Sequence, residues 1–276
     1  MRGEIIGRDE AGRIHERLGR LVESHVPDAV VAFTSGSLPY GAAVRGHSDI
    51  DVNIMLPPGT RADQAFFDCL SGFIDDYSGL HEQHGMRLDR RYPGEYLTVD
   101  QALDAAAGRG VPVINGRPML PRQLGDSYWN TTEETWYLAW MGALAFSRHV
   151  VGNTDVLTGL RRQAWATVAA LCLPDLTDRD FRVEDVVARV LDQGHPSGGF
   201  GVHPGYRRFA ELETPHCRQA LADLAARAVL GRRDDGSVFV EREGLLRWGT
   251  DLADRHQAGF HAAPLLTVTS SLRLAV

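Results

Sequence analysis

Residues 29–52 read AVVAFTSGSLPYGAAVRGHSDIDV, and this stretch decides the fold of the first part of the chain. Its opening run, Ala29 to Phe33, is apolar and rich in valine, which predicts a short buried strand. Residues 49–56 alternate between polar and apolar side chains, which predicts a second strand with one face toward solvent. Gly36 and Pro39 lie between the two runs and indicate a turn and the start of a short helix.

Two carboxylates stand two residues apart on the second of these strands, at Asp49 and Asp51. Side chains at positions i and i+2 of a strand project from one face, with Cα atoms about 6–7 Å apart. Bare carboxylates at that spacing repel each other, so we expect a divalent cation between them. Gly36 permits close approach of a ligand to the backbone, and Ser37 offers a hydroxyl and an N–H at a helix start that favours phosphate.

A third acid from a neighbouring strand would complete a site for phosphoryl or nucleotidyl transfer. Asp89, within the sequence RLDRR, is the first candidate, and Glu95 is its rival. Arg87 and Arg91 flank Asp89; they could bind phosphate bidentately, or they could form a surface ladder with the acid.

The sequence contains no lysine, and all 29 of its basic residues are arginine. This absence excludes Schiff-base enzymes, lysyl-adenylate ligases and any P-loop that needs its lysine. A site for an anion must therefore use arginine, histidine, backbone N–H groups or a metal ion.

The formal net charge of −7 and the isoelectric point of about 5.9 have the wrong sign for binding nucleic acid through its phosphates. They favour a small, cationic partner, and a triphosphate would need Mg²⁺ before it could bind. The three cysteines have no C-x-x-C or zinc-binding spacing, which favours buried thiols of a reducing compartment over a disulfide framework, and no long apolar run is present. We therefore expect a cytoplasmic protein with no membrane partner; its oligomeric state stays open.

The rest of the first part predicts further helices and strands. Helices are expected over residues 9–26 and 61–79, and further strands over residues 86–92 and 96–99. His81 and His84 do not have the spacing of a metal-binding helix, so we expect them to be exposed loop residues.

The pattern changes after the Gly- and Pro-rich residues 108–126, which predict a linker. Helical periodicity then covers residues 131–151, 156–173, 181–192, 206–230 and 240–258, with a strand or tail at 265–276. The Gly-rich loop 194–206 lacks the dinucleotide-binding fingerprint, and its role stays open. The expected fold class is α+β, with a mixed sheet and flanking helices in residues 1–110 and an all-helical domain in residues 111–276.

The order of an apolar strand, Gly36-Ser37, eleven intervening residues and Asp49-Ile50-Asp51 resembles the signature of the DNA polymerase β nucleotidyltransferase superfamily. The resemblance covers about residues 29–100 and implies a nucleotidyltransferase-type sheet. Many small-molecule members, including aminoglycoside and lincosamide nucleotidyltransferases, pair such a domain with a C-terminal helical domain, which implies that the second part here receives the acceptor.

The resemblance also implies roles for single residues. Gly36 and Ser37 would hold the terminal phosphates of a nucleoside triphosphate such as ATP. Asp49 and Asp51 would bind Mg²⁺, with two ions expected in the site. The third carboxylate, Asp89 or Glu95, would bind the second metal ion or act as general base toward the acceptor.

Four further side chains are candidates for contact with the nucleotide. Ser48 immediately precedes the first acid, and Arg45 lies in the helix between the two halves of the motif. Arg87 and Arg91 complete the set, since a protein cation that meets the triphosphate must here be an arginine.

The expected function is Mg²⁺-dependent transfer of a nucleoside monophosphate to a hydroxyl, or another nucleophile, of a small molecule, with release of pyrophosphate. Antibiotic modification or natural-product metabolism would fit such an acceptor. Two alternatives stay open: nucleotidylation of a protein or a tRNA end, and a catalytically degenerate module that only binds nucleotide.

Overall fold

The computed structural model describes residues 4–39, 41, 43–61, 64–88, 94–106, 113–114, 117–118, 144, 147–176, 179–186 and 210–255. These residues form a mixed α+β structure around a four-stranded sheet with the order β3-β2-β1-β6. β1 (Val31–Ser35) pairs antiparallel with both β2 (Asp51–Leu56) and β6 (Arg148–Gly152). β3 (Glu95–Thr98) pairs with β2 in parallel, so the sheet is mixed.

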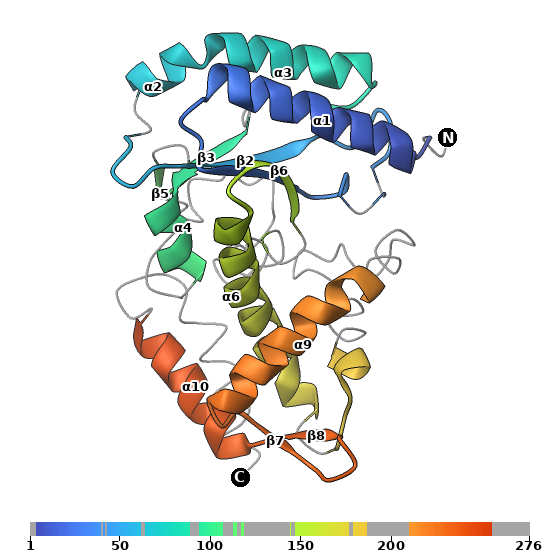
Figure 1. Ribbon diagram of the computed structural model, residues 1–276, viewed down its shortest axis with the longest axis vertical. Helices are drawn as coiled ribbons and strands as arrows, with labels where there is room; N and C mark the ends of the chain where they lie inside the picture. Colours follow the sequence, from blue (N-terminus) through green and yellow to red (C-terminus); the bar gives the residue numbers. More distant parts are fainter. Residues whose placement is uncertain are drawn as a thin grey trace.

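Three helices cover one face of the sheet, and two others lie against the opposite face (Figure 1). The covering helices are α1 (Arg8–His25), α2 (Gln64–Cys69) and α3 (Ser71–Gln83). On the opposite face lie α4 (Val99–Ala106) and α6 (Thr154–Cys172). The sheet is thus enclosed between two helical layers, which requires its strands to bury both faces.

The helices form where apolar residues recur at helical spacing. In α1, Ile14, Leu18 and Val22 are buried at intervals of four residues and pack toward the sheet. Asn153 caps α6, because its side-chain oxygen accepts hydrogen bonds from the first N–H groups of the helix.

Beyond α6 the chain adds smaller elements around the same apolar core. They are η2 (Leu173–Leu176), α9 (Ala210–Ala226), β7 (Leu230–Arg232), β8 (Val238–Val240) and α10 (Arg242–Arg255). β7 and β8 form an antiparallel hairpin, as do the short β4 (Val113–Ile114) and β5 (Arg117–Pro118). α6 and α9 pack against each other.

Two apolar clusters occupy the two faces of the sheet. Ile50, Val52 and Ile54 belong to the cluster beneath α1 and α3. Phe33 and Met55 belong to the cluster that continues into α6, α9 and α10. The prediction that β2 has one solvent-exposed face is therefore wrong, since Asn53 and Met55 on that face are buried beneath the second half of the chain.

Several predicted elements differ from the observed ones. The helix expected over residues 61–79 is divided at Leu70 into α2 and α3. No strand forms at residues 86–88, the described start of the strand expected over 86–92.

The second part of the chain is not confirmed as all-helical. Residues 148–151, expected to be helical, form β6 together with Gly152 and complete the sheet beside β1. A buried central strand needs hydrogen-bond partners along both edges, and helical periodicity carries no information about that need. The sheet therefore draws residues from both sides of the boundary expected after residue 110.

None of the helices in the described ranges combines the length and the apolar character needed to cross a membrane. The expected tail at 265–276 and the loop 194–206 lie outside the described residues.

Candidate active site

The two halves of the Gly-Ser and Asp-x-Asp pattern meet at one end of β1 and β2. Ser35 pairs with Asp51 in the antiparallel ladder, so the turn after β1 begins beside the second carboxylate. Gly36 has φ +70°, and a β-carbon there would lie 1.8 Å from Asp51 Oδ2. Only glycine both adopts this left-handed backbone conformation readily and lacks a β-carbon that would overlap with the carboxylate.

Side chains on the same face of the sheet continue this polar end. Asp51 and Asn53 alternate with the apolar residues beneath α3 and therefore point to the opposite face. Asn53 Nδ2 donates a hydrogen bond of 3.1 Å to Ser35 Oγ. Asn53 is 1% exposed, and its Oδ1 has no hydrogen-bond partner among the described residues. A buried, unused acceptor therefore lies beside the carboxylates.

Glu95 reaches this polar end from the neighbouring strand. In the parallel pairing of β2 and β3, Glu95 lies opposite Asn53. Burial raises the pKa of Glu95 to about 7, and the negative charge of Asp49 adds to the shift. The described structure thus brings Glu95 close to the Asp-x-Asp pair, whereas the other candidate, Asp89, lies outside the described residues.

Glu95 is positioned by the glycine before it. Gly94 has φ +109°, and a β-carbon there would lie 3.1 Å from Val52 Cγ1 and 3.3 Å from the Tyr96 hydroxyl oxygen. The chain can therefore enter β3 tightly against β2, which is the approach that sets Glu95 beside the acids.

The backbone of Ile50, between the two acids, is held by α3. The Ile50 N–H donates to His81 Nε2 at 3.0 Å, and the Tyr77 hydroxyl donates to the Ile50 carbonyl oxygen. His81 is 1% exposed and lies in α3, so the prediction of an exposed loop histidine is wrong. Its spacing of four residues from Tyr77 on an apolar helix face was the signal that could have identified it.

The two candidate serines differ in what surrounds them. Ser37 is half-buried in the turn directly after Gly36. Ser48 Oγ accepts a hydrogen bond of 2.9 Å from the Val44 N–H, and its backbone N–H donates to the Val44 carbonyl. The contacts described for Ser48 therefore close the turn before Asp49.

The candidate arginines are dispersed. Arg45 forms ion pairs with Glu10 at 2.5 Å and with Glu4 at 3.1 Å, and it also donates to the His84 carbonyl. Glu10 lies in α1 and His84 directly follows α3, and both helices cover the face of the sheet opposite Asp51. Arg87 is exposed, and its backbone N–H donates to the carbonyl of Ser48, next to Asp49. Arg91 lies outside the described residues.

The donor set is compatible with Mg²⁺ although it is small. Across the described ranges, no three histidine, cysteine or carboxylate side chains form a group that could hold a metal ion. Mg²⁺ in nucleotide-dependent enzymes commonly takes only one or two carboxylates, with substrate phosphates and water as its other ligands. Asp49 and Asp51 meet that lower requirement. Gly36 has no side chain that would occupy the space beside the Asp51 carboxylate.

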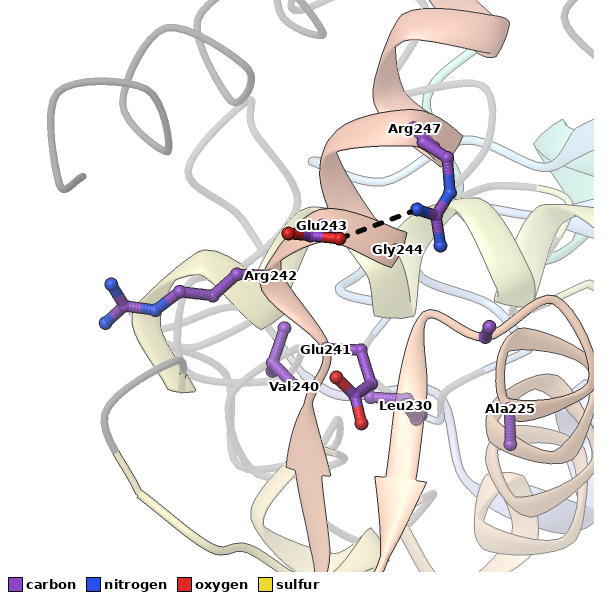
Figure 2. Close-up of a pocket in the computed structure, with 9 residues that line it drawn as sticks. Ala225, Leu230, Val240, Glu241, Arg242, Glu243, Gly244 and Arg247 are labelled. Atoms are coloured by element: carbon purple, nitrogen blue, oxygen red, sulfur yellow. Dashed lines mark ion pairs between the residues drawn. The ribbon is translucent and has the colours of Figure 1, made fainter.

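A hollow of about 570 Å³ lies at the start of α10, away from these acids (Figure 2). Carboxylates and guanidinium groups both line it, and Glu243 forms an ion pair of 3.8 Å with Arg247. Arg242 points away from the hollow in Figure 2. The hollow is therefore lined by charges of both signs, some of which pair with each other, and this lining favours no particular ligand.

Comparisons with known proteins give no relatives: no family model, no curated protein and no solved structure matches this chain.

Proposed function

We propose that the chain is a Mg²⁺-dependent nucleotidyltransferase, which moves a nucleoside monophosphate from a nucleoside triphosphate to a hydroxyl of a small molecule and releases pyrophosphate. The observation that carries the proposal is the contact between Gly36 and the Asp51 carboxylate. It joins a phosphate-binding turn to a pair of potential metal ligands, which is the combination that this chemistry needs.

In this proposal, Asp49 and Asp51 hold Mg²⁺. When bound there, the ion would neutralise the negative charge that develops on the phosphates during transfer. Gly36 and Ser37 bind the terminal phosphates through backbone N–H groups and a hydroxyl. The residues of the sheet form a nucleotidyltransferase-type domain, within about residues 1–110 and β6, and the mainly helical remainder receives the acceptor.

Glu95 serves as the general base. Its pKa of about 7 suits proton acceptance near neutral pH. The acceptor hydroxyl gives its proton to the Glu95 carboxylate while its oxygen bonds to the α-phosphorus. The bond breaks between the α-phosphorus and the oxygen that links it to the β-phosphate. Pyrophosphate leaves with the electron pair of that bond.

The acceptor is a small, hydroxylated cation of the aminoglycoside type. The net charge of −7 and the carboxylates at this end of the sheet attract positive charge. The same charge disfavours a polynucleotide acceptor.

A catalytically degenerate nucleotide-binding module is the second candidate. It is favoured by the lack, within the described ranges, of a third metal-binding side chain beside Asp49 and Asp51. Such a module would bind Mg²⁺ and nucleotide without transferring any phosphorus.

The test is to incubate the purified chain with Mg²⁺, each of the four nucleoside triphosphates labelled at the α-phosphate, and a panel of aminoglycosides. Labelled product and pyrophosphate are both measured. Asp49→Asn and Asp51→Asn should reduce transfer by about 10²–10³-fold, the scale expected when one contact to developing charge is removed.

Asp75→Asn is the matched control, because Asp75 is exposed on α3 and belongs to no part of the site. It should transfer at the wild-type rate. Transfer that survives in both Asp49→Asn and Asp51→Asn would disprove the catalytic assignment. Binding of Mg²⁺ and ATP by a wild-type chain that transfers to no acceptor would favour the binding module.

A further inference from the structure

The peptide units on both sides of Ile50 are held by two side chains of one helix. The Ile50 N–H belongs to the peptide that joins it to Asp49, and it donates to His81 Nε2 at 3.0 Å. The Ile50 carbonyl belongs to the peptide that joins it to Asp51, and it accepts from the Tyr77 hydroxyl. Tyr77 and His81 thus hold the whole backbone segment between the two carboxylates.

The sheet does not supply these bonds. β2 begins at Asp51, and its pairing with β3 begins only at Asn53. On the side toward β3, Ile50 therefore lies before the start of the ladder, where its buried polar groups need other partners. Asp51 is held by its pairing with Ser35, and the peptide that joins Asp49 to Ile50 is held by α3.

The two side chains are themselves constrained. Since an N–H can only donate, His81 Nε2 must be the acceptor, and Nδ1 carries the proton that bonds the Tyr77 carbonyl at 2.9 Å. Their rings meet edge to face at 4.5 Å. Burial lowers the pKa of His81 and raises that of Tyr77, so both stay neutral in the forms that these bonds require.

We infer that Tyr77 and His81 are positioning residues, which set the relative orientation of Asp49 and Asp51 for metal binding by holding both peptides of Ile50. The inference rests on the proposed function, because it takes the two carboxylates to be metal ligands. Neither side chain needs to touch the substrate: each acts through the backbone of Ile50.

The test measures Mn²⁺ binding, as a probe for the Mg²⁺ site, by electron paramagnetic resonance in the presence of ATP. Tyr77→Phe removes one hydroxyl and keeps the ring, so it should fold and bind Mn²⁺ about 10-fold more weakly. His81→Leu should weaken binding by at least as much. His81→Gln retains an acceptor for the Ile50 N–H and should restore affinity to within about 3-fold of wild type.

His15 provides a matched control on α1. It is also a buried helical histidine, bonded through Nδ1 to the Ala11 carbonyl four residues earlier, but its Nε2 meets the Thr34 hydroxyl and no backbone group of the acid pair. His15→Leu should lower the melting temperature without weakening Mn²⁺ binding. If His81→Leu and Tyr77→Phe weaken binding no more than His15→Leu, the inference is overturned.

Two further measurements separate this inference from the proposed function. If wild type binds no Mn²⁺, or if Asp49→Asn and Asp51→Asn bind it normally, the proposed function and the inference both fail. If those variants lose binding while Tyr77→Phe and His81→Leu do not, only the inference fails. Nitrogen NMR of the histidines should find the Nδ1–H tautomer at His81, and hydrogen exchange should find a slowly exchanging Ile50 amide proton. The Nε2–H tautomer at His81 would overturn the inference directly.

Discussion

Gly36 lies directly against the carboxylate of Asp51, so close that a β-carbon on Gly36 would be 1.8 Å from Oδ2. The contact joins a turn and a strand that are separated in sequence by residues 37–50. The described residues of that segment form turns and no helix, so the short helix expected there, with Arg45 in it, does not form. Glycine is therefore needed at position 36 for two reasons: it allows the turn, and it leaves room for the Asp51 carboxylate.

Replacing Gly36 with alanine should displace Asp51 and abolish most Mn²⁺ or Mg²⁺ binding. The added methyl group cannot coexist with the carboxylate at its present position, and the φ of +70° adds backbone strain of about 1–3 kcal/mol. Urea unfolding measures the loss of stability, and calorimetric titration with Mg²⁺ and ATP measures the loss of binding.

Gly46→Ala is the control for strain alone. Gly46 has φ +75°, and a β-carbon there would meet nothing within 4 Å. Its variant should lose a similar amount of stability and keep wild-type binding. Equal binding by the two variants would show that the Gly36–Asp51 contact is unimportant.

Glu95→Gln should remove an inflection from the pH profile of kcat/KM. Only the deprotonated carboxylate can accept a proton, so transfer by the wild type should fall about tenfold per pH unit below its pKa of about 7. The glutamine variant should be slower by about 10²–10⁴-fold, with no inflection near neutral pH. An inflection that persists in the variant would assign it to another group.

Stability should decline in acid because of His15. Burial lowers the pKa of His15 from 6.5 to about 4, so between these values the unfolded chain binds a proton that the folded chain does not. The stability contributed by neutral His15 is complete above about pH 6.5 and decreases by about 3 kcal/mol as the pH falls to about 4.

The measurement is the free energy of unfolding in urea for wild type and His15→Gln across this pH range. The glutamine cannot titrate, so the difference between the two proteins should shrink toward acid, while contributions from other groups cancel. Parallel curves would contradict the prediction.

Arg45→Gln should lower the melting temperature and leave the KM for the nucleoside triphosphate unchanged. The guanidinium bonds Glu10, Glu4 and the carbonyl of His84, on the face of the sheet opposite Asp51. The Arg87 backbone N–H donates to the Ser48 carbonyl oxygen, which places Arg87 beside the acids. Arg87→Gln should therefore raise this KM by about 10-fold, which corresponds to the loss of one charge-assisted hydrogen bond. A larger rise in KM for Arg45→Gln would reverse the assignment.

The predicted elements that the structure confirms are those with a strong local pattern. β1 and β2 form close to the two runs that flank Gly36, and α1 forms within one residue of residues 9–26. Strand β6 was missed because its residues pair with β1, more than a hundred positions earlier in the sequence. The alternation in residues 49–56 correctly predicted a strand. It also predicted that one face of this strand is exposed to solvent, whereas the later part of the chain covers that face.

The candidate site shows the same division. Sequence spacing singled out Gly36, Asp49 and Asp51, whereas the contact between Gly36 and Asp51 follows from the register of β1 and β2. His81 was placed with exposed loop residues because the sequence HEQH does not reveal that helix α3 continues through it and packs on Ile50.

The sequence by itself determined which side chains are available: two acids two residues apart, a glycine and a serine ahead of them, and arginine as the only strong cation. Such properties depend on neighbours within a few residues, where spacing fixes direction. Only the tertiary structure decided that Glu95 lies beside the pair and that Tyr77 and His81 hold Ile50. These relationships depend on strand register and on how a helix packs across the sheet, which are set by burial of the whole core and not by any local pattern.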